Sequence, residues 1–319
     1  MVTTTKQDEV LRILQRQASK KRSKDDSVIL PLDTPGNEIT QPWCVYETSS
    51  MHVLVRVAGL ILNAFSKPGY KVFARGQACF CDEGRMLPAI SRGLGNVGAC
   101  SIEKRMSKLL TLRKEIAGSL PKNNRFQDDA ILAVLQHYGI RTHWLDVVDN
   151  LFVALWFACN SRTETQPYSY FSANTTGHLY LLQVEDGQMV TNDWECRQNA
   201  QLSGGERAKW RDLRREHTSL SLRPHAQHAV MISRICEATP SDVSQLDLTD
   251  SVLAEIRFPA GSKISEFMSE NKRDLMPWMF PPMSKDDTYS RLRRGKVLKV
   301  IRSVVGNHTT ELGDIDLYV

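Results

Sequence analysis

The sequence lacks several of the motifs that point directly to one chemistry. It contains no Gly-x-x-x-x-Gly-Lys loop for nucleotide phosphates and no Gly-x-Ser-x-Gly elbow of a serine hydrolase. None of its cysteines forms a Cys-x-x-Cys pair, which leaves a disulfide framework or a zinc cluster unsupported. His225-x-x-His228 has no partner carboxylate motif, so we predict no metal site.

Long apolar runs are also absent. The best candidate, Val53 to Phe65, contains Arg56 and Asn63 and falls short of the roughly 18 apolar residues of a membrane span. The first residues, MVTTTKQDEV, lack the apolar core of a signal peptide. The composition, 41% hydrophobic and 24% charged, is typical of a soluble globular protein. We therefore predict a cytoplasmic protein with no membrane partner.

An excess of positive charge is present, but it is modest, with a formal net charge of +5. Basic side chains gather in three stretches: Lys20 to Lys24, Arg207 to Arg215, and Arg291 to Lys299. Such stretches can attract nucleic acid or an anionic nucleotide, or they can be solvated helix faces. Aromatic residues do not alternate with the basic ones, as they do on platforms that bind single strands.

The order of the periodic segments predicts an α+β fold with a helical N-terminal half. Helical spacing of apolar residues predicts helices at 5–19, 51–65, 101–120, 126–138, 151–159, 205–217 and 264–275. Residues that favour sheets predict strands at 70–74, 177–184, 227–235, 253–258 and 296–304. We divide the chain into an N-terminal helix with a mobile polar and basic arm (1–42), an α+β domain (43–290), and a basic C-terminal strand and tail (291–319).

The densest cluster of groups that could do chemistry lies in a turn between two apolar helices. His137 ends the first helix just before Gly139, and His143 and Asp146 follow within the turn. Either histidine can act as an acid or a base, because imidazole titrates near neutral pH. His137 can equally cap the last carbonyl groups of its helix. Asn150 or Asp149 can cap the next helix, and Asp146 can also do so instead of orienting a histidine.

Three separated segments resemble the FRG-domain family. Phe73-Ala74-Arg75-Gly76-Gln77, followed by Leu87 to Arg92, is similar to the opening motif of that family. Leu135 to Asp146, followed by Val153 to Ala158, is similar to its longest signature. Arg223, Ala226-Gln227 and Glu255 to Ala260 are similar to its later motifs.

The layout of the FRG-domain family in turn resembles the ADP-ribosyltransferase fold, which implies a split β-sheet core that uses NAD as a substrate. In that fold one strand supplies an arginine, a second supplies small hydroxyl residues, and a late strand supplies Glu or Gln. The implied catalytic residues are Arg75, His143, and Gln227 or Glu255. The implied NAD-binding residues are Arg75, Gly76, Gln77, His137, Tyr138, Thr142 and Asp146.

These residue types suit the cleavage of the bond between nicotinamide and ribose. The guanidinium of Arg75 offers a rigid fork to the pyrophosphate, and Gly76 allows the backbone to approach closely. A carboxylate or amide can orient the ribose, and a carboxylate can also stabilise the positive charge that develops on it. Each residue also has a structural interpretation: Arg75 as an ion-pair partner of Asp146 or Glu83, and Gln227 as a hydrogen-bonding core residue.

The resemblance therefore predicts an NAD-dependent ADP-ribosyltransferase-like enzyme that modifies nucleic acid or protein, or that hydrolyses NAD. A setting in toxin activity or antiphage defence is implied by the resemblance alone. The alternative is a non-enzymatic sensor that binds nucleotides or nucleic acid through Arg75 and the basic stretches. A third interpretation is a structural interaction domain in which the signature residues only build the core.

Overall fold

The structure is a computed structural model in which the chain forms two compact units. It describes residues 6–18, 27–29, 43–78, 84–91, 100–119, 130–161, 169–170, 176–185, 208–216, 221–234, 240, 242–259, 262–270 and 278–305. Unit 1 comprises Met1–Met86, Val148–Gly187 and Thr249–Asp274. Unit 2 comprises Leu87–Val147, Gln188–Leu248 and Leu275–Val319. Both units mix helices and strands, which confirms the α+β class.

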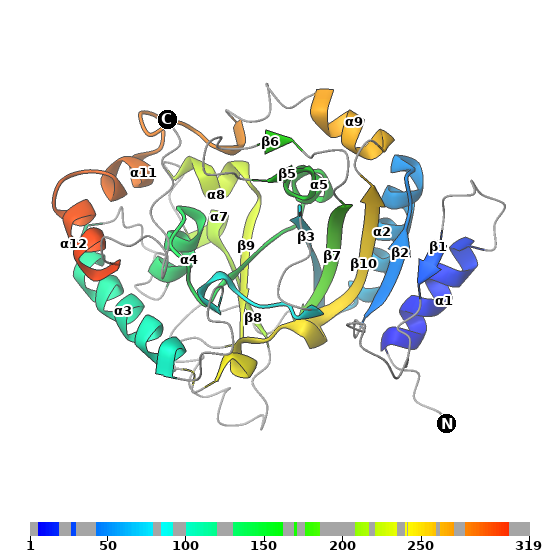
Figure 1. The fold of residues 1–319 in the computed structure, drawn as a ribbon, viewed down its shortest axis with the longest axis horizontal. Helices are drawn as coiled ribbons and strands as arrows, with labels where there is room; N and C mark the ends of the chain where they lie inside the picture. Colours follow the sequence, from blue (N-terminus) through cyan, green and yellow to red (C-terminus); the bar gives the residue numbers. More distant parts are fainter. Residues whose placement is uncertain are drawn as a thin grey trace. The chain divides into compact units, whose positions relative to one another are not determined.

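Unit 1 is built on a mixed sheet with the strand order β1-β2-β10-β7-β3 (Figure 1). The strands are β1 (Ser27–Ile29), β2 (Cys44–Glu47), β3 (Tyr70–Gln77), β7 (Thr176–Glu185) and β10 (Val252–Pro259). β2 and β10 run parallel, whereas the other neighbours run antiparallel. A separate small ribbon pairs β5 (Asn160–Ser161) with β6 (Ser169–Tyr170).

The helices of unit 1 are α1 (Lys6–Ala18), α2 (Met51–Phe65), α5 (Leu151–Cys159), α9 (Lys263–Glu270) and the 3-10 turn η5 (Thr249–Ser251). Two of them, α2 and α5, begin at capping side chains. Ser50 caps α2 by accepting a hydrogen bond from the amide of Val53. Asn150, and not Asp146, caps α5 by accepting from the amides of Phe152 and Val153. α5 then packs its apolar residues against β3 and β7.

Unit 2 combines helices with a smaller set of strands. Its helices are α3 (Cys100–Ile116), α4 (Ala130–His137), α7 (Leu213–Glu216), α8 (Leu222–Ala226), α11 (Asp287–Leu292) and α12 (Gly295–Val305), with 3-10 turns η2 (Ala89–Ser91) and η4 (Val243–Leu246). Its strands are β4 (Leu145–Val148, whose last residue begins a segment of unit 1), β8 (Lys209–Asp212) and β9 (Ala229–Ser233). β8 and β9 pair in antiparallel register.

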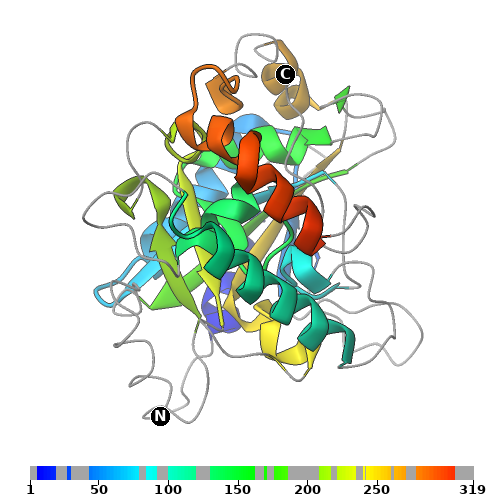
Figure 2. The ribbon, with the colours of Figure 1, turned by 90° about the vertical axis from the view of Figure 1, so that its left-hand side faces the viewer.

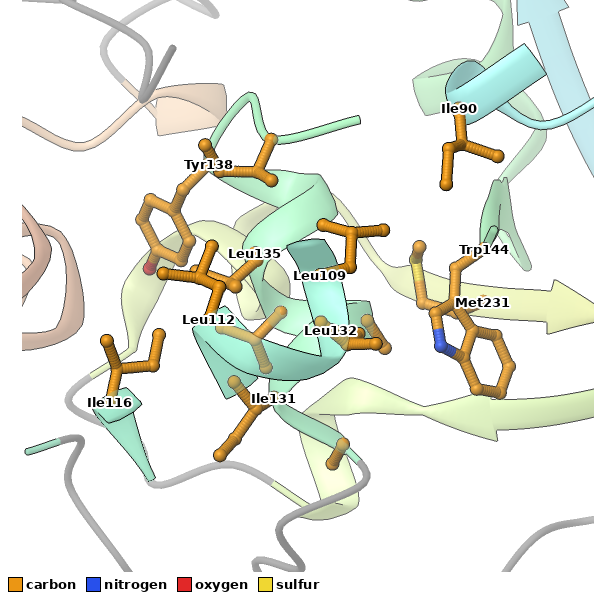
Figure 3. Packing of buried hydrophobic residues seen from close by; sticks show 14 of the residues in the cluster. Ile90, Leu109, Leu112, Ile116, Ile131, Leu132, Leu135, Tyr138, Trp144 and Met231 are labelled. Atoms are coloured by element: carbon orange, nitrogen blue, oxygen red, sulfur yellow. The ribbon is translucent and has the colours of Figure 1, made fainter. Parts of the chain in front are cut away.

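The core of unit 2 forms where α4 meets α3 (Figure 3). The residues of α4 from Ala130 to Leu135 are buried throughout, so this helix lies inside the unit rather than on its surface. α3 contributes a single stripe at helical spacing: Ile102, Met106, Leu109, Leu112 and Ile116. The turn after α4 adds Tyr138, Ile140 and Trp144 to the same core. The turn that carries the predicted chemistry is therefore anchored in packed side chains.

Several predicted elements differ in the structure. The predicted strand at 296–304 is wrong, because residues 295–305 form the helix α12. Val297, Val300, Ile301 and Val304 recur at helical spacing and face the core, so period outweighs the preference of valine and isoleucine for sheets. Residues 27–29 of the predicted arm form β1, which pairs with β2. The rest of 20–42, and the tail at 306–319, lie outside the described residues.

The region from 205 to 235 also differs from its prediction. Residues 209–212 form β8, and only 213–216 of the predicted helix 205–217 are helical among the described residues. The predicted strand at 227–235 begins later, at Ala229. Gln227 lies instead at the end of α8, where its amide N–H bonds to the carbonyl oxygen of Arg223. His228 then turns the chain with a positive φ of 51°.

None of the helices in the described ranges combines the length and the apolar character that crossing a bilayer requires. Within the same ranges, His, Cys, Asp and Glu side chains form no group of three or more that could hold a metal ion.

Candidate functional site

The sheet of unit 1 carries a row of polar side chains on one face. Register places Arg75 of β3 opposite Tyr180 of β7, and Tyr180 opposite Glu255 of β10. In the next row, Gln77, His178 and Arg257 are matched in the same way. Directly opposed residues, and residues two apart along a strand, share one face of a sheet. We call these residues the polar face: Arg75, Gln77, His178, Tyr180, Glu255 and Arg257.

The opposite face of the same strands is apolar, and α5 covers it at β3 and β7. Gly76, Leu179 and Ile256 form a matched row between the two polar rows. A Cβ atom on Gly76 would lie 1.7 Å from the backbone oxygen of Ala154 in α5, so no side chain fits there. The close approach of β3 and α5 therefore requires glycine at position 76, and it leaves Arg75 and Gln77 to project from the other face.

Glu255 is the centre of the polar face and is completely buried, with 0% exposure. Its Oε1 atom accepts hydrogen bonds from Nε of Arg257 (2.8 Å) and lies 2.6 Å from Nδ1 of His178. Its Oε2 atom accepts from Nε1 of Trp43 (2.9 Å) and Nη2 of Arg257 (3.1 Å). Burial raises the pKa of Glu255, but these hydrogen bonds outweigh burial and lower the pKa below its ordinary value. The carboxylate is thus held charged.

Aromatic rings fix the positions of the groups around Glu255. The rings of Trp43 and Tyr180 meet edge to face at 5.8 Å, and Tyr180 stacks with His178 at 6.2 Å. His178 and Tyr180 are nearly buried, whereas the side chain of Arg257 is 20% exposed. Burial lowers the pKa of Arg257, but its bonds to Glu255 outweigh burial and raise it. The guanidinium therefore stays charged and fixed at the edge of the cluster.

Arg75 and Gln77 form the more accessible side of the polar face. Both are partly buried, and Nε of Arg75 donates to Oε1 of Gln77 at 2.9 Å. Neighbouring strands lie about 4.8 Å apart, so the backbones at Arg75 and Glu255, two strands away, are separated by about 10 Å. Two guanidinium groups, those of Arg75 and Arg257, thus project from one sheet face, where they can bind an anion with two charged centres.

Four residues of this cluster were not predicted from the sequence: Trp43, His178, Tyr180 and Arg257. A signal existed in the strand Gly177 to Val184, where His178 and Tyr180 alternate with apolar residues. A strand that is apolar only on alternate positions has one polar face. The pair Glu255-x-Arg257 shows the same period-two spacing. Spacing alone does not predict that these residues of β7 and β10 lie side by side, because the register between distant strands decides which residues are opposed.

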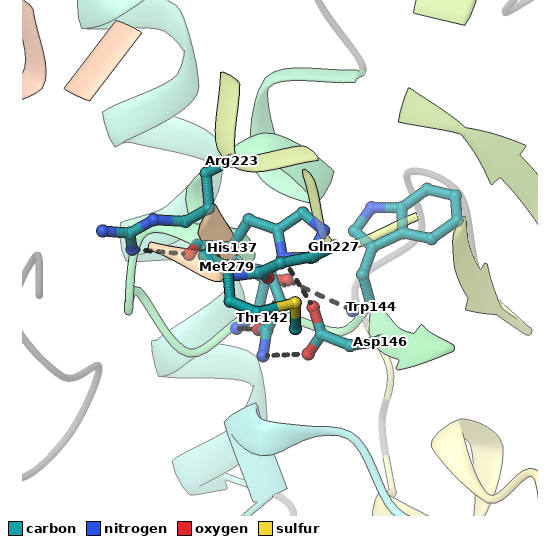
Figure 4. A network of polar contacts seen from close by, with 8 residues as sticks. His137, Thr142, Trp144, Asp146, Arg223, Gln227 and Met279 are labelled. Atoms are coloured by element: carbon teal, nitrogen blue, oxygen red, sulfur yellow. Dashed lines mark hydrogen bonds and ion pairs between the residues drawn. The ribbon is translucent and has the colours of Figure 1, made fainter. Parts of the chain in front are cut away.

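In unit 2, the predicted turn is organised by Gln136, which was not among the predicted site residues. Figure 4 shows two of the residues that it contacts, Thr142 and Asp146. Its Oε1 atom accepts hydrogen bonds from the backbone amide of Thr142 (2.7 Å) and from the Thr142 hydroxyl (3.1 Å). Its Nε2 atom donates to Oδ2 of Asp146 at 3.1 Å. The hydroxyl of Thr142 also accepts from the amide of Trp144 at 3.2 Å. Thr142 is completely buried, and the hydrogen bonds of its hydroxyl group stabilise the turn.

The two histidines of the turn are both held neutral by burial. Nδ1 of His137 lies 3.4 Å from Oδ1 of Asp146, whose side chain is 33% exposed. Burial lowers the pKa of His137, Asp146 raises it, and Arg223 lowers it, with a lowered pKa as the result. His143 is 1% exposed, and neither of its ring nitrogens has a hydrogen-bond partner among the described residues. Burial, aided by the charge of Arg113, lowers the pKa of His143 to about 3.

Tyr138 and Gln227 direct their polar atoms into the interior of unit 2. The hydroxyl of Tyr138 donates to the carboxylate of Asp286, at 2.8 Å from Oδ2. Burial, followed by the charge of Asp286, raises the pKa of Tyr138 well above its ordinary range. The side-chain nitrogen of Gln227 donates to the carbonyl oxygen of Met279 at 2.7 Å. Both side chains thus connect segments that lie far apart in the sequence.

Arg223 joins the same interior and is surrounded by aromatic rings. Its guanidinium carbon lies 4.8 Å from the ring centres of Tyr138 and Tyr289, and 5.3 Å from that of Phe280. Its Nη1 atom donates to the carbonyl oxygen of His137 at 3.1 Å. This bond meets the end of α4, where a cation is favoured by the helix dipole. Arg223 therefore connects the end of α4 to the aromatic side chains in the interior of unit 2.

The predicted site residues are divided between the two units. Unit 1 holds Arg75, Gly76, Gln77 and Glu255 and brings them together on β3 and β10. Unit 2 holds His137, Tyr138, Thr142, His143, Asp146 and Gln227. Within unit 2, His137, Thr142 and Asp146 meet around Gln136, whereas Tyr138 and Gln227 bond to Asp286 and Met279.

The fold and site thus define a mixed α+β protein with a charged cluster on the central sheet of unit 1. Residues 71–166 match the FRG domain, and the chain carries this domain. The matched residues include Arg75 to Gln77 and the turn from His137 to Asp146, but neither β7 nor β10. Comparisons with curated proteins and with solved structures find no match.

Proposed function

We propose that this protein is an NAD-dependent enzyme of the ADP-ribosyltransferase type, which transfers ADP-ribose to nucleic acid or protein, or to water. The observation that supports the proposal most is the polar face of unit 1. There Arg75, Tyr180 and Glu255 are aligned by register across adjacent strands. The resemblance of the FRG signature to the ADP-ribosyltransferase layout, with an arginine on one strand and a late acidic residue, agrees with this alignment.

In this proposal Arg75 and Arg257 bind the pyrophosphate of NAD, since guanidinium groups bind phosphate oxygens in pairs. Gln77 orients Arg75 through its 2.9 Å hydrogen bond. Glu255 is a positioning residue, because its oxygen atoms are already occupied by Trp43, His178 and Arg257. It fixes Arg257 and the imidazole of His178.

The reaction breaks the bond between ribose C1′ and the nicotinamide nitrogen, and nicotinamide leaves with the bonding electrons. A nucleophilic oxygen or nitrogen of the acceptor then bonds to C1′ and loses its proton. His178 is suited to accept that proton, since Glu255 holds its Nδ1 side at 2.6 Å. His143 and Gln227 have no part in the proposal, because one is buried without polar contacts and the other bonds to Met279.

Purified protein incubated with NAD provides the test. Release of nicotinamide and transfer of labelled ADP-ribose to DNA, RNA and protein acceptors would be measured for wild type, Arg75→Ala and Arg56→Ala. Arg56 lies exposed on α2 in the same unit and is the matched control. We expect Arg75→Ala to lower turnover by about 100-fold, because misplaced substrate loses the advantage of orientation. Wild type that neither releases nicotinamide nor labels any acceptor contradicts the proposal.

The second candidate is a module that binds a nucleotide without turnover. The complete burial of Glu255 favours this candidate, because no carboxylate of the polar face is presented to a ligand. It predicts that NAD or ADP-ribose raises the melting temperature of wild type, but not of Arg75→Ala, in the absence of nicotinamide release. A setting in toxin activity or antiphage defence stays a prediction from the FRG resemblance.

A further inference from the structure

The helix α12 in unit 2 carries only positive charge. Its only charged residues are Lys296, Lys299 and Arg302, all of which are exposed. At about 1.5 Å per residue, these three cations span about 9 Å along the helix. Their three-residue spacing places them within one side of the helix. α12 thus presents a basic stripe without acidic residues.

The other side of α12 is buried. Val297 is 8% and Ile301 1% exposed, and Val300 and Val304 pack against the same core. α12 lies along α3, as Figures 1 and 2 both show. α3 carries exposed Lys104 and Lys114 next to exposed Glu103 and Glu115, so the excess of positive charge comes from α12. The basic stripe therefore lies on a helix whose other side is packed in the core of unit 2.

We infer that the basic stripe of α12 binds the phosphate backbone of duplex DNA. Duplex DNA carries one negative charge per about 1.7 Å of its axis, so closely spaced cations displace several counterions at once. Neither α12 nor α3 contains an aromatic residue, which disfavours a single strand that would need stacking platforms. The inference concerns a different unit from the proposed NAD site and does not depend on that function.

Two other anionic partners fit the stripe less well. A membrane surface would require the apolar side of α12 to enter the lipid interface, but that side is buried in unit 2. An acidic protein partner normally adds an apolar or aromatic anchor. The exposed large hydrophobic residues among those described, Tyr70, Phe152, Phe267 and Trp278, all lie outside α3 and α12.

The stripe offers few side-chain groups that could bind the 2′-hydroxyl groups of duplex RNA. Proteins that bind duplex RNA contact its 2′-hydroxyl groups across the minor groove. α12 has no amide or carboxylate side chain, and its Ser303 hydroxyl donates to the carbonyl oxygen of Val300 at 2.8 Å. On α3, the hydroxyl of Thr111 likewise donates to the carbonyl oxygen of Ser107 at 3.0 Å. The stripe thus offers cations for phosphates and few groups for ribose.

The test is the binding of a fluorescently labelled DNA duplex of about two helical turns to the full chain, followed by anisotropy at several salt concentrations. The variant Lys296→Gln/Lys299→Gln/Arg302→Gln removes the stripe but retains good helix-forming residues. The matched control, Arg12→Gln/Arg56→Gln/Lys263→Gln, removes the same charge from exposed positions of unit 1. Melting temperatures of both variants would verify folding.

We expect the stripe variant to bind at least about tenfold more weakly at low salt, and the control to bind within about twofold of wild type. The slope of log K against log salt concentration should become shallower by about 2 to 3, since each phosphate contact contributes about 0.9. Equal losses in both variants, or no loss in the stripe variant, would overturn the inference. So would tighter binding of duplex RNA, a single strand or anionic vesicles than of duplex DNA.

Discussion

Glu255 in unit 1 and His143 in unit 2 are both almost completely buried, at 0% and 1% exposure, yet their surroundings differ. Glu255 is bonded by Trp43, His178 and Arg257, and its pKa is lowered so that it stays charged. His143 has no hydrogen-bond partner for either ring nitrogen among the described residues, and its pKa is lowered so that it stays neutral.

The two regions therefore differ: unit 1 holds a charged cluster, whereas unit 2 holds a turn with buried, neutral histidines. The sequence had predicted site residues in both. Unit 1 fixes ionised groups close to partly exposed Arg75 and Gln77, an arrangement that suits the proposed binding of an anionic substrate. Unit 2 encloses neutral imidazoles in packed side chains. Burial that suppresses the charge of a histidine leaves it without the proton exchange that acid–base catalysis needs.

The largest expected effect comes from removing the charge at the centre of unit 1. Glu255→Gln keeps the size of the side chain but leaves Arg257 without its buried counter-charge. We expect the free energy of unfolding to fall by about 3–5 kcal/mol, which denaturant titration would measure. Because the folded pKa of Glu255 is lowered, its contribution is present above the unfolded pKa of about 4.3 and is lost as pH falls through the folded pKa.

The matched control for that change is Glu47→Gln. Glu47 lies 4.0 Å from Arg257, but its side chain is 41% exposed. Exposed ion pairs contribute less than about 1 kcal/mol, so the control should remain close to wild type. Similar losses in the two variants would mean that Glu255 has no special role in holding unit 1 together, and the comparison with His143 would lose its basis.

The sequence predicted the elements in which local signals agree. Ser50 and Asn150 cap α2 and α5 as their residue types suggest, and the strands β3, β7 and β10 follow residues that favour sheets. The strand predicted at 296–304 was wrong, because the valines and isoleucine of α12 favour sheets by residue type but recur at helical spacing. Local pattern thus predicted most of the element types, and it failed where composition and period disagreed.

The polar face was beyond prediction for a different reason. Arg75, Tyr180 and Glu255 are separated by long stretches of chain, and only strand order and register make them neighbours. Sequence spacing favoured the turn at His137 to Asp146, where chemically capable residues are close along the chain.

The sequence also contains the glycine pattern Gly93-x-Gly-x-x-Gly98. It follows no predicted strand, so it is weak evidence for nucleotide binding. It lies outside the described residues.

A smaller effect tests how the apolar side of the sheet supports the polar face. Gly76→Ala places a Cβ atom 1.7 Å from the backbone oxygen of Ala154, so β3 or α5 must move. We expect a loss of about 1–3 kcal/mol in the free energy of unfolding. The shift of β3 should also displace Arg75 and reduce any rise in melting temperature caused by NAD.

The control is Gly59→Ala, since a Cβ atom at that position in α2 meets nothing within 4 Å. Alanine within a helix should raise the free energy of unfolding by about 0.5–1 kcal/mol. Two alanine substitutions in one unit are thus expected to have opposite signs. If Gly76→Ala proved neutral, the close packing of β3 on α5 would not be what positions Arg75.

The smallest effect at neutral pH is expected at His143. His143→Leu replaces a neutral imidazole without hydrogen bonds by an apolar side chain, so stability at pH 7 should change by less than about 1 kcal/mol. The difference should appear in acid. The folded pKa of about 3 lies below the unfolded value of about 6.5, so the unfolded chain binds the proton first and wild type loses stability as pH falls.

Between pH 6.5 and 5 this linkage destabilises wild type by about 2 kcal/mol relative to His143→Leu, and the difference grows until the pH reaches the folded pKa. Denaturant titrations at a series of pH values, with His52→Leu as an exposed-histidine control on α2, would measure it. Parallel pH profiles for wild type and His143→Leu would show that the imidazole is protonated in the folded protein. His143 would then resemble the charged groups of unit 1, and it would again be a candidate for acid–base chemistry.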